Sequence, residues 1–200
     1  MGADKLNSSR KTLPGILAGL AAIILSAELG AAELRFIEVE RDEELYTLKS
    51  ITWFGADAEA LYEVLSNYEL FSRFTSAIVE SKNLDPDESG RRRYYTRMEG
   101  CVLLWCKSFI RIGHLTLHPK TEIIASADPE QSDFKRSRER WQLIPEGEGT
   151  VLVYEFEMVP DFWVPPVIGP YYMKRALKRG GRRAVDRIEA LALGEEPATF

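Results

Sequence analysis

The chain has 200 residues, of which 45% are hydrophobic and 28% charged, and its formal net charge is −5. This composition excludes a disordered, collagen-like or repeat protein, and the length suits one domain whose core can hold a pocket. The net acidity argues against a general nucleic-acid-binding protein, so no nucleic-acid partner is expected. Two cysteines and two histidines exclude a four-cysteine zinc site, and no mixed site has regular ligand spacing. We therefore expect neither a metal nor another cofactor.

The first 32 residues have the order of a secretory signal peptide. Basic residues come first, an apolar run follows, and small residues end the segment: Lys5, Arg10 and Lys11, then 13–27, then Gly30, Ala31 and Ala32. This order predicts cleavage after Ala32. The apolar run has about 15 residues, fewer than the roughly 20 that span a bilayer. We expect residues 1–32 to be removed and the protein to be periplasmic or secreted; an uncleaved membrane anchor is the alternative.

Export would place Cys101 and Cys106 in an oxidising compartment, where a disulfide between them is one expectation. On a single continuous strand, their odd spacing points the two side chains to opposite faces, so the bond requires a turn or bulge between them. Two reduced, buried cysteines are the other expectation, because a free cysteine behaves as a small hydrophobic residue.

The predicted elements begin after an N-terminal extension, residues 33–44. Residues 45–54 are rich in β-branched and aromatic residues and predict a strand. Asp57 then stands where a helix N-cap belongs, and apolar residues at helical spacing predict a helix that ends near Leu65. Aromatic residues three apart predict a second short helix over 67–74.

Six consecutive strands follow, separated by turn-forming clusters rich in Pro, Gly and Asp. They are expected at residues 76–84, 91–99, 105–117, 120–127, 134–144 and 150–159, with Gly100 ending the second. Short connections between successive strands imply an antiparallel meander. Alternation along the strands places apolar residues, such as Trp141 and Leu152, on one face of the sheet and arginines and glutamates on the other.

A stiff connector rich in proline and aromatic residues, 159–170, leads into a long final helix. Apolar residues recur at spacings of three or four from Met173 to Leu191, and seven basic residues between 174 and 187 lie among them. The helix therefore has an apolar stripe and a basic back. Residues 194–200 are expected to form a flexible tail.

The basic back of this helix has two interpretations. It would attract an anionic membrane surface, at about 1 kcal/mol for each basic residue near the surface. The residues concerned are Lys174, Lys178, Arg179 and Arg182. Alternatively, it is a solvated face paired with nearby acids such as Asp186 and Glu189.

The order of these elements, with particular core and turn residues, points to a family. Those residues are Ala56 to Leu65, Tyr68 to Phe74 with Ile78 and Glu80-Ser81, Trp141-Gln-Leu, Gly149-Thr150 before Tyr154, and the terminal helix. The chain resembles the START-like (SRPBCC) helix-grip superfamily over about residues 45–193, in the branch of polyketide cyclase/dehydrase-like and coenzyme Q-binding START-domain proteins. The resemblance implies an α+β fold in which a curved antiparallel sheet wraps around the long C-terminal helix. It also implies an apolar cavity between them for a lipid, isoprenoid or polyketide.

The sequence supplies apolar walls for such a cavity. The candidate ligand-binding residues are Trp141, Tyr154 and Phe156 from the sheet, Met173 and Leu177 from the helix, and Phe162 and Trp163 at the rim. Each of them also suits an ordinary close-packed core. Gly180 and Gly181 each cost about 1 kcal/mol in mid-helix relative to Ala and so indicate close approach by a strand or a ligand.

No catalytic residue stands out. His114 and His118 lie four apart on one predicted strand, about 13 Å from each other, which is too far to share a metal. The sequence has no G-x-S-x-G elbow, P-loop or G-x-G-x-x-G fingerprint. We expect an exported protein that binds a hydrophobic small molecule, such as a lipid, isoprenoid quinone or polyketide-like compound. One alternative is a polyketide cyclase/dehydrase-type enzyme, which convergent polar groups in the cavity would favour. The other is a non-catalytic interaction module at the membrane surface, which a filled core would favour.

Overall fold

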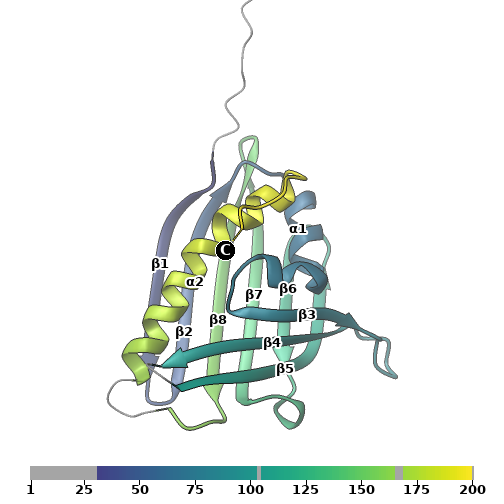
Figure 1. The fold of residues 1–200 in the computed structure, drawn as a ribbon. Coiled ribbons are helices and arrows are strands. Elements are labelled where there is room, and N and C mark those ends of the chain that lie inside the picture. The colour runs from purple at the N-terminus through teal and green to yellow at the C-terminus, as the bar shows by residue number, and fades with distance from the viewer. Residues whose placement is uncertain (1–30, 103–104, 165–168, 200) are drawn as a thin grey trace, which may run out of the picture.

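A computed structural model describes residues 31–102, 105–164 and 169–199. In these residues, eight strands form a curved sheet and a long helix lies across one face of it (Figure 1). The strands are β1 (Glu33–Asp42), β2 (Leu45–Phe54), β3 (Ile78–Leu84), β4 (Arg93–Val102), β5 (Trp105–His118), β6 (Glu122–Ala127), β7 (Phe134–Glu146) and β8 (Gly149–Pro160). The helices are α1 (Ala58–Ser66) and α2 (Gly169–Ala192), with two 3-10 helices, η1 (Tyr68–Arg73) and η2 (Pro129–Gln131).

The eight strands form one antiparallel sheet in the order β1-β2-β8-β7-β6-β5-β4-β3. Strands β3 to β8 follow one another as a meander, as their short connections predict. The β1–β2 hairpin joins the other edge because β2 pairs with β8. Figure 1 shows β3, β4 and β5 running across the direction of β1, β2 and β8, so the sheet bends around α2. This is the predicted α+β helix-grip fold.

The expected N-terminal extension, residues 33–44, is instead part of the sheet. It forms β1 and the turn to β2, with Glu43 at a positive φ of 51° in the turn. Ile37 and Val39 alternate with glutamates there, which is the period of a strand. The strand is difficult to recognise because it lies at an edge of the sheet and seven of its ten residues are exposed.

Gly100 does not end its strand as expected. Strand β4 continues through it, and Gly100 pairs with Lys107 of β5. A side chain on Gly100 would lie 3.4 Å from the ring of Phe109, so glycine leaves room for that ring. Cys101 and Cys106 stand opposite each other at this end of the hairpin, and their sulfur atoms are bonded at 2.06 Å.

The two short helices form where the local sequence predicts them. The side chain of Asp57 caps α1 by accepting a hydrogen bond from the Ala60 backbone N–H at 2.8 Å. The aromatic segment 67–74 forms η1, in which the rings of Tyr68 and Phe71 stack with centroids 3.9 Å apart. These rings are buried with Trp141 in the main core, which α1, η1 and the C-terminal part of α2 close against the sheet. The helices therefore cover one end of the curved sheet and leave the middle of α2 facing it.

Residues 1–30 of the predicted signal peptide, 1–32, lie outside the part of the chain that the structure describes. None of the described helices is long and apolar enough to cross a membrane. At the other end, Glu196 in the expected flexible tail pairs with Arg73 at 2.5 Å. The flexibility of residues 194–200 stays a prediction.

Candidate ligand cavity

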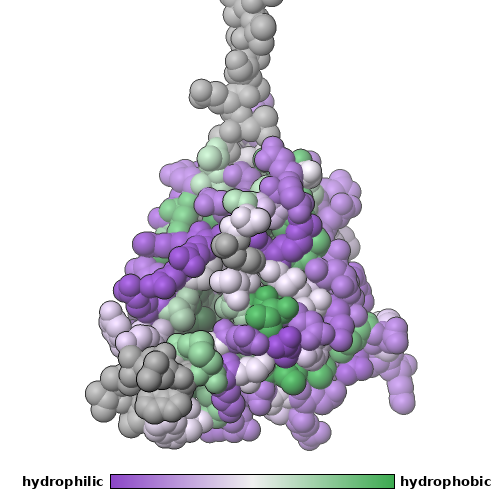
Figure 2. All heavy atoms as spheres, viewed as in Figure 1, coloured by the Kyte–Doolittle hydropathy of each residue, from purple (hydrophilic) through white to green (hydrophobic). Residues whose placement is uncertain are grey.

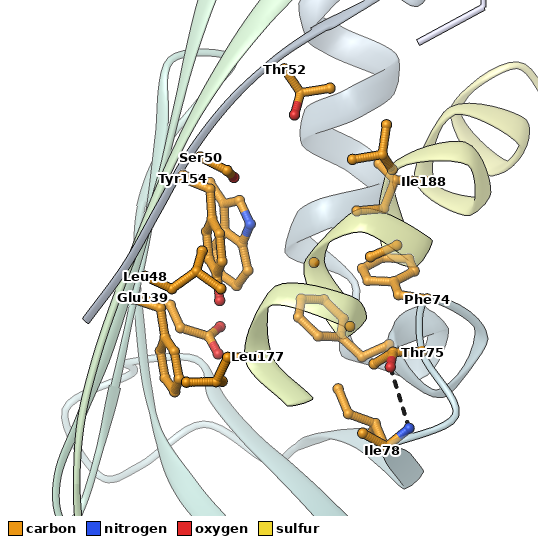
Figure 3. A pocket seen from close by; sticks show the side chains of 18 of the residues that line it. Leu48, Ser50, Thr52, Phe74, Thr75, Ile78, Glu139, Tyr154, Leu177 and Ile188 are labelled. Carbon is orange, nitrogen blue, oxygen red and sulfur yellow. Dashed lines mark hydrogen bonds between the residues drawn. The ribbon is translucent and has the colours of Figure 1, made fainter. Parts of the chain in front are cut away.

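A cavity of about 260 Å³ lies between the sheet and α2. Strands β2, β7 and β8 form one wall, α2 forms the opposite wall, and the segment after η1 closes a third side. Figure 3 shows Leu48 and Tyr154 on the sheet side and Leu177 on α2, with Phe74 and Ile78 on the third side. Figure 2 shows the surface hollowed beside α2, with hydrophobic residues in the hollow. The interior is therefore not filled by its own side chains.

Five of the seven predicted ligand-binding residues line this cavity. They are Trp141, Tyr154, Phe156, Met173 and Leu177. Strand alternation places the first three on the inner face, and helical spacing places the last two opposite them. The rings of Trp141 and Tyr154 stack with centroids 5.1 Å apart, which fixes the orientation of both in the wall.

The two predicted rim residues do not line the cavity. Phe162 stacks on Phe109 with ring centroids 4.1 Å apart and meets Phe134 edge-on, so it packs in a separate small core. Trp163 is 77% exposed and is not part of that core. The reason is that residues following Pro160 leave the sheet before α2 begins, and a pattern of aromatic residues does not show which way such a connector turns.

A buried ion pair that the sequence patterns do not predict interrupts the apolar wall. Arg111 of β5 is 2% exposed and Glu139 of β7 is 6% exposed, and both line the cavity. Nη1 of Arg111 donates a hydrogen bond to Oε1 of Glu139 at 2.6 Å. The guanidinium also lies 5.6 Å from the ring centre of Tyr94 and 5.5 Å from that of Phe156, which favours a cation there.

Burial and the charges of this pair shift the pKa values of the groups in this part of the wall. Burial is the largest influence on Arg111 and acts to lower its pKa, but the charge and hydrogen bond of Glu139 together with Tyr94 and Tyr68 outweigh burial, and the pKa is raised. Burial raises the pKa of Tyr68 and Tyr154, and the Glu139 carboxylate raises both further. Both phenols are therefore neutral at physiological pH and keep a proton to donate.

Two polar atoms of the ion pair have no hydrogen-bond partner among the described residues. They are Nε of Arg111 and Oε2 of Glu139. Buried polar atoms are normally paired, because leaving one unpaired costs about 1–3 kcal/mol. The wall of the apolar cavity thus contains a buried ion pair that keeps one acceptor and one donor unpaired among the described residues.

One weak sequence signal pointed to this ion pair. Glu139, Trp141 and Leu143 are two residues apart along β7, so they share a face of the strand. The strand period therefore places a carboxylate on the apolar face. The sequence does not show that it meets Arg111, because β6 lies between β5 and β7 in the sheet. Glu139 pairs with Ala125 of β6, and Ala125 pairs with Leu115 of β5, four residues from Arg111, so the two charged side chains meet diagonally across β6.

The basic back of α2 lies outside the cavity. Six of its cations have no carboxylate within 4.0 Å in the part of the chain that the structure describes: Lys174, Arg175, Lys178, Arg179, Arg182 and Arg183. The expected alternative, pairing of this face with Asp186 and Glu189, is therefore wrong for these six. A second hollow of about 450 Å³ lies between this face and β1, where Phe36 and Tyr171 are 40% and 62% exposed.

The two histidines take no part in the cavity. Both lie on β5, where Nε2 of His114 is 3.3 Å from Asp87 and Nε2 of His118 is 3.7 Å from Glu122. Each has a local carboxylate partner at the surface, and neither is among the residues that line the cavity.

Comparison with known proteins identifies both a family and a fold. The sequence profile of the family described as polyketide cyclase/dehydrase and lipid transport matches residues 54–172. No curated protein sequence matches the chain.

Solved structures with the same fold are distant in sequence. A START superfamily protein from Mycobacterium smegmatis is 18% identical with a TM-score of 0.56, covering 74% of this chain and 97% of its own. Human STARD10 is 16% identical with a TM-score of 0.59, covering 82% of this chain and 75% of its own. The Zhui aromatase/cyclase from Streptomyces sp. R1128 is 14% identical, with a TM-score of 0.51, and the match covers 75% of this chain and 92% of the aromatase/cyclase. These similarities show the START helix-grip fold alone.

Proposed function

This chain belongs to the polyketide cyclase/dehydrase and lipid transport family, and from that membership we propose that it binds and carries a hydrophobic small molecule in the cavity between the sheet and α2. The observation that carries the proposal is the unfilled, largely apolar cavity lined by Trp141, Tyr154 and Leu177. Burial of apolar ligand surface there is favourable by about 25 cal/mol per Å². An interaction module with a filled core does not fit this interior.

The size and polarity of the cavity limit the ligand. A volume of about 260 Å³ lies near the lower end of the roughly 300–1,000 Å³ typical of small-molecule pockets. It suits one acyl or isoprenoid chain, or a small ring system, rather than both chains of a phospholipid. The free Oε2 of Glu139 calls for a hydrogen-bond donor on the ligand, such as a hydroxyl group.

A charge placed in the apolar wall tests the binding site. The probe is a fluorescently labelled long-chain alcohol. We expect the variant Leu177→Arg to weaken binding of this alcohol at least tenfold, because a buried unpaired charge is costly. Ile144→Arg is the matched control, since Ile144 is 42% exposed and does not line the cavity. Leu177→Trp, which fills the cavity without a charge, should also weaken binding. Unchanged binding in both folded Leu177 variants would place the ligand elsewhere.

A second candidate function is polyketide cyclisation or dehydration, favoured by the convergence of Arg111, Glu139 and Tyr154 on the cavity. Here Tyr154 would be the neutral proton donor and Glu139 the proton acceptor. The test is conversion of a poly-β-ketone thioester, followed by mass spectrometry of the products. Turnover that Glu139→Gln abolishes, while the probe alcohol still binds, would favour the enzyme over the carrier.

We propose further that the protein is exported and that α2 docks on an anionic membrane surface. The support is the set of six cations on α2 that have no ion-pair partner among the described residues, with the exposed rings of Phe36 and Tyr171 beside them. A cationic face flanked by aromatic rings suits the interface of an anionic bilayer. Membrane contact beside the cavity would let an apolar ligand enter without crossing water.

Charge reversal tests the membrane surface. We expect Lys178→Glu, Arg179→Glu and Arg182→Glu together to abolish binding to phosphatidylglycerol vesicles at low salt, because electrostatic attraction to the surface is lost. The matched control reverses three exposed cations outside α2, Arg92, Lys120 and Lys135. Equal vesicle binding by both triple variants would show that α2 is not the docking face.

A further inference from the structure

Glu189 is a buried carboxylate for which the described residues provide no cationic partner. It lies in the last turn of α2 and is 7% exposed. No lysine, arginine or histidine of the described residues forms an ion pair with it, in contrast to Glu139, which pairs with Arg111. A buried carboxylate without a counter-charge is unusual, because hydrogen bonds alone leave part of the cost of its desolvation uncompensated.

The position of Glu189 in the helix makes its charge less favourable still. The C-terminal end of a helix carries a partial negative charge and favours cations. The last turn of α2 has no basic residue to balance it. Both burial and the helix end therefore call for a positive charge at this carboxylate.

The two oxygens of Glu189 accept hydrogen bonds from backbone nitrogens. Oε1 accepts from the Gly55 N–H at 2.8 Å, and Oε2 accepts from the N–H of Ala32 in a short contact. Gly55 belongs to the link between β2 and α1, whereas Ala32 stands immediately before β1. Ala31, its neighbour, is exposed. A backbone nitrogen at the end of the predicted export signal thus lies against the unpaired carboxylate.

We propose that export processing cuts the chain between Ala31 and Ala32, and that the new α-ammonium group of Ala32 pairs with Glu189. The inference rests on the proposed export. The cut turns an uncharged N–H contact into an ion pair. The ammonium group then supplies the positive charge that both the burial of Glu189 and its position at the helix end favour. An α-amino group has an ordinary pKa of about 7.7–8.0, so it is largely charged at neutral pH.

The chemistry of the cut is ordinary peptide hydrolysis by a signal peptidase. Water adds across the Ala31–Ala32 bond; the hydroxyl group goes to the carbonyl carbon of Ala31, and the nitrogen of Ala32 becomes an amine that takes up a proton. Ala31 leaves with the signal peptide as its new carboxylate terminus. The folded chain then begins at the residue that contacts Glu189.

This site differs by one residue from the cut that small-residue spacing predicts, which lies after Ala32. A chain that begins at Glu33 has its amino group opposite Trp53 in the β1–β2 ladder. Glu189 Oε2 would then lose its contact with Ala32 altogether. The two cuts give products that differ by the mass of one alanine residue.

The first test reads the N-terminus directly. The full chain is expressed in a bacterial host with its own export machinery, and the mature protein is analysed by intact mass and N-terminal sequencing. We expect a chain that begins at Ala32. A chain that begins at Glu33 would overturn the inference while leaving export intact, and an uncut chain would overturn both. Neither result bears on ligand binding, which the Leu177 variants test separately.

The second test measures the ion pair in purified protein. All described strands and α-helices lie between residues 33 and 192, so a chain that begins at residue 31 or 32 retains the fold. The chain beginning at Ala32 should have a Tm at least about 3 °C above that of the chain beginning at Ala31, whose amino group lies one residue further away. Glu189→Gln in both chains should remove this difference. An equal difference with glutamine, or none with glutamate, would contradict the ion pair.

Discussion

Arg111 and Glu139 are both almost fully buried, and each keeps one polar atom without a partner among the described residues. An ion pair of this kind contributes little net stability, because desolvation offsets the attraction of the charges. Buried polar atoms are normally hydrogen-bonded, and two atoms of this pair are not. A ligand with a suitable polar group would supply the missing hydrogen bonds. Under the proposed carrier function, the role of the pair would be to orient the ligand rather than to stabilise the fold.

Removal of one partner should be far more costly than removal of both. We expect Arg111→Met to lower the free energy of unfolding by about 3–5 kcal/mol, because it leaves the Glu139 carboxylate buried and uncompensated. Adding Glu139→Gln to that variant should recover about 2 kcal/mol of the loss. Urea unfolding of the two single variants and the double variant measures this coupling. Strictly additive losses would show that the two groups do not act as a pair.

The free acceptor should give the cavity a preference among apolar ligands. We expect a long-chain alcohol to bind about tenfold more tightly than its methyl ether, because the ether cannot donate a hydrogen bond to Glu139 Oε2. Competition with the fluorescent alcohol measures both affinities. Equal affinities would assign the polar end of the ligand to another part of the cavity.

At the residue scale, the sequence predicted the apolar wall but not its polar group. Trp141, Tyr154 and Leu177 follow from strand and helix periods. Arg111 and Glu139 lie on strands that β6 separates in the sheet, so no local pattern reveals that they meet. The direction of Phe162 and Trp163 depends on the path of a connector, and periodicity gives no information about that path.

At the scale of elements, α2 is both a wall of the cavity and a basic surface. The two glycines in its middle have different neighbours. A Cβ on Gly181 would lie 2.9 Å from Cδ1 of Ile37 on β1, whereas a Cβ on Gly180 would lie 3.8 Å from Oγ1 of Thr75. The predicted close approach of a strand is therefore present at Gly181 and is only an ordinary contact at Gly180.

This difference predicts opposite effects of alanine at the two positions. Gly180→Ala should stabilise the protein by about 0.5–1 kcal/mol, because it removes the entropic cost of glycine in a helix. Gly181→Ala should be at least about 1 kcal/mol less stable than Gly180→Ala, because Ile37 must move. Chemical denaturation measures the free energy of unfolding of both variants. Adding Ile37→Val to the Gly181→Ala variant should restore part of its lost stability. If the two alanine variants are equally stable, β1 does not restrict α2 at this point.

Element types were predictable and some boundaries were not. The caps, the turn clusters and the periods predicted α1, η1, the meander and α2. Strand β1 was missed because an exposed, acidic edge strand lacks a continuous apolar face. Strand β4 continues through Gly100 because Gly100 pairs with Lys107 of β5, and this pairing is not visible in the local sequence.

At the scale of the whole molecule, the fold leaves space between a bent sheet and one long helix. The order of the elements predicted a meander and one long terminal helix, and the family resemblance implied that the sheet wraps around this helix. The presence of the cavity was an implication of the resemblance and could not be calculated from side-chain types. Whether bulky residues fill the space depends on their packing, and here they leave about 260 Å³.

The most direct test of the account is to identify what the protein carries. The protein is purified from an export-competent bacterial host, extracted with organic solvent, and its extract analysed by mass spectrometry beside that of Leu177→Arg. We predict a single-chain lipid, isoprenoid or other apolar compound with a hydroxyl or similar donor group, near one molecule per protein and depleted in the variant. A well-folded protein whose extract is empty, and which also fails to bind the long-chain alcohol, would contradict the carrier function.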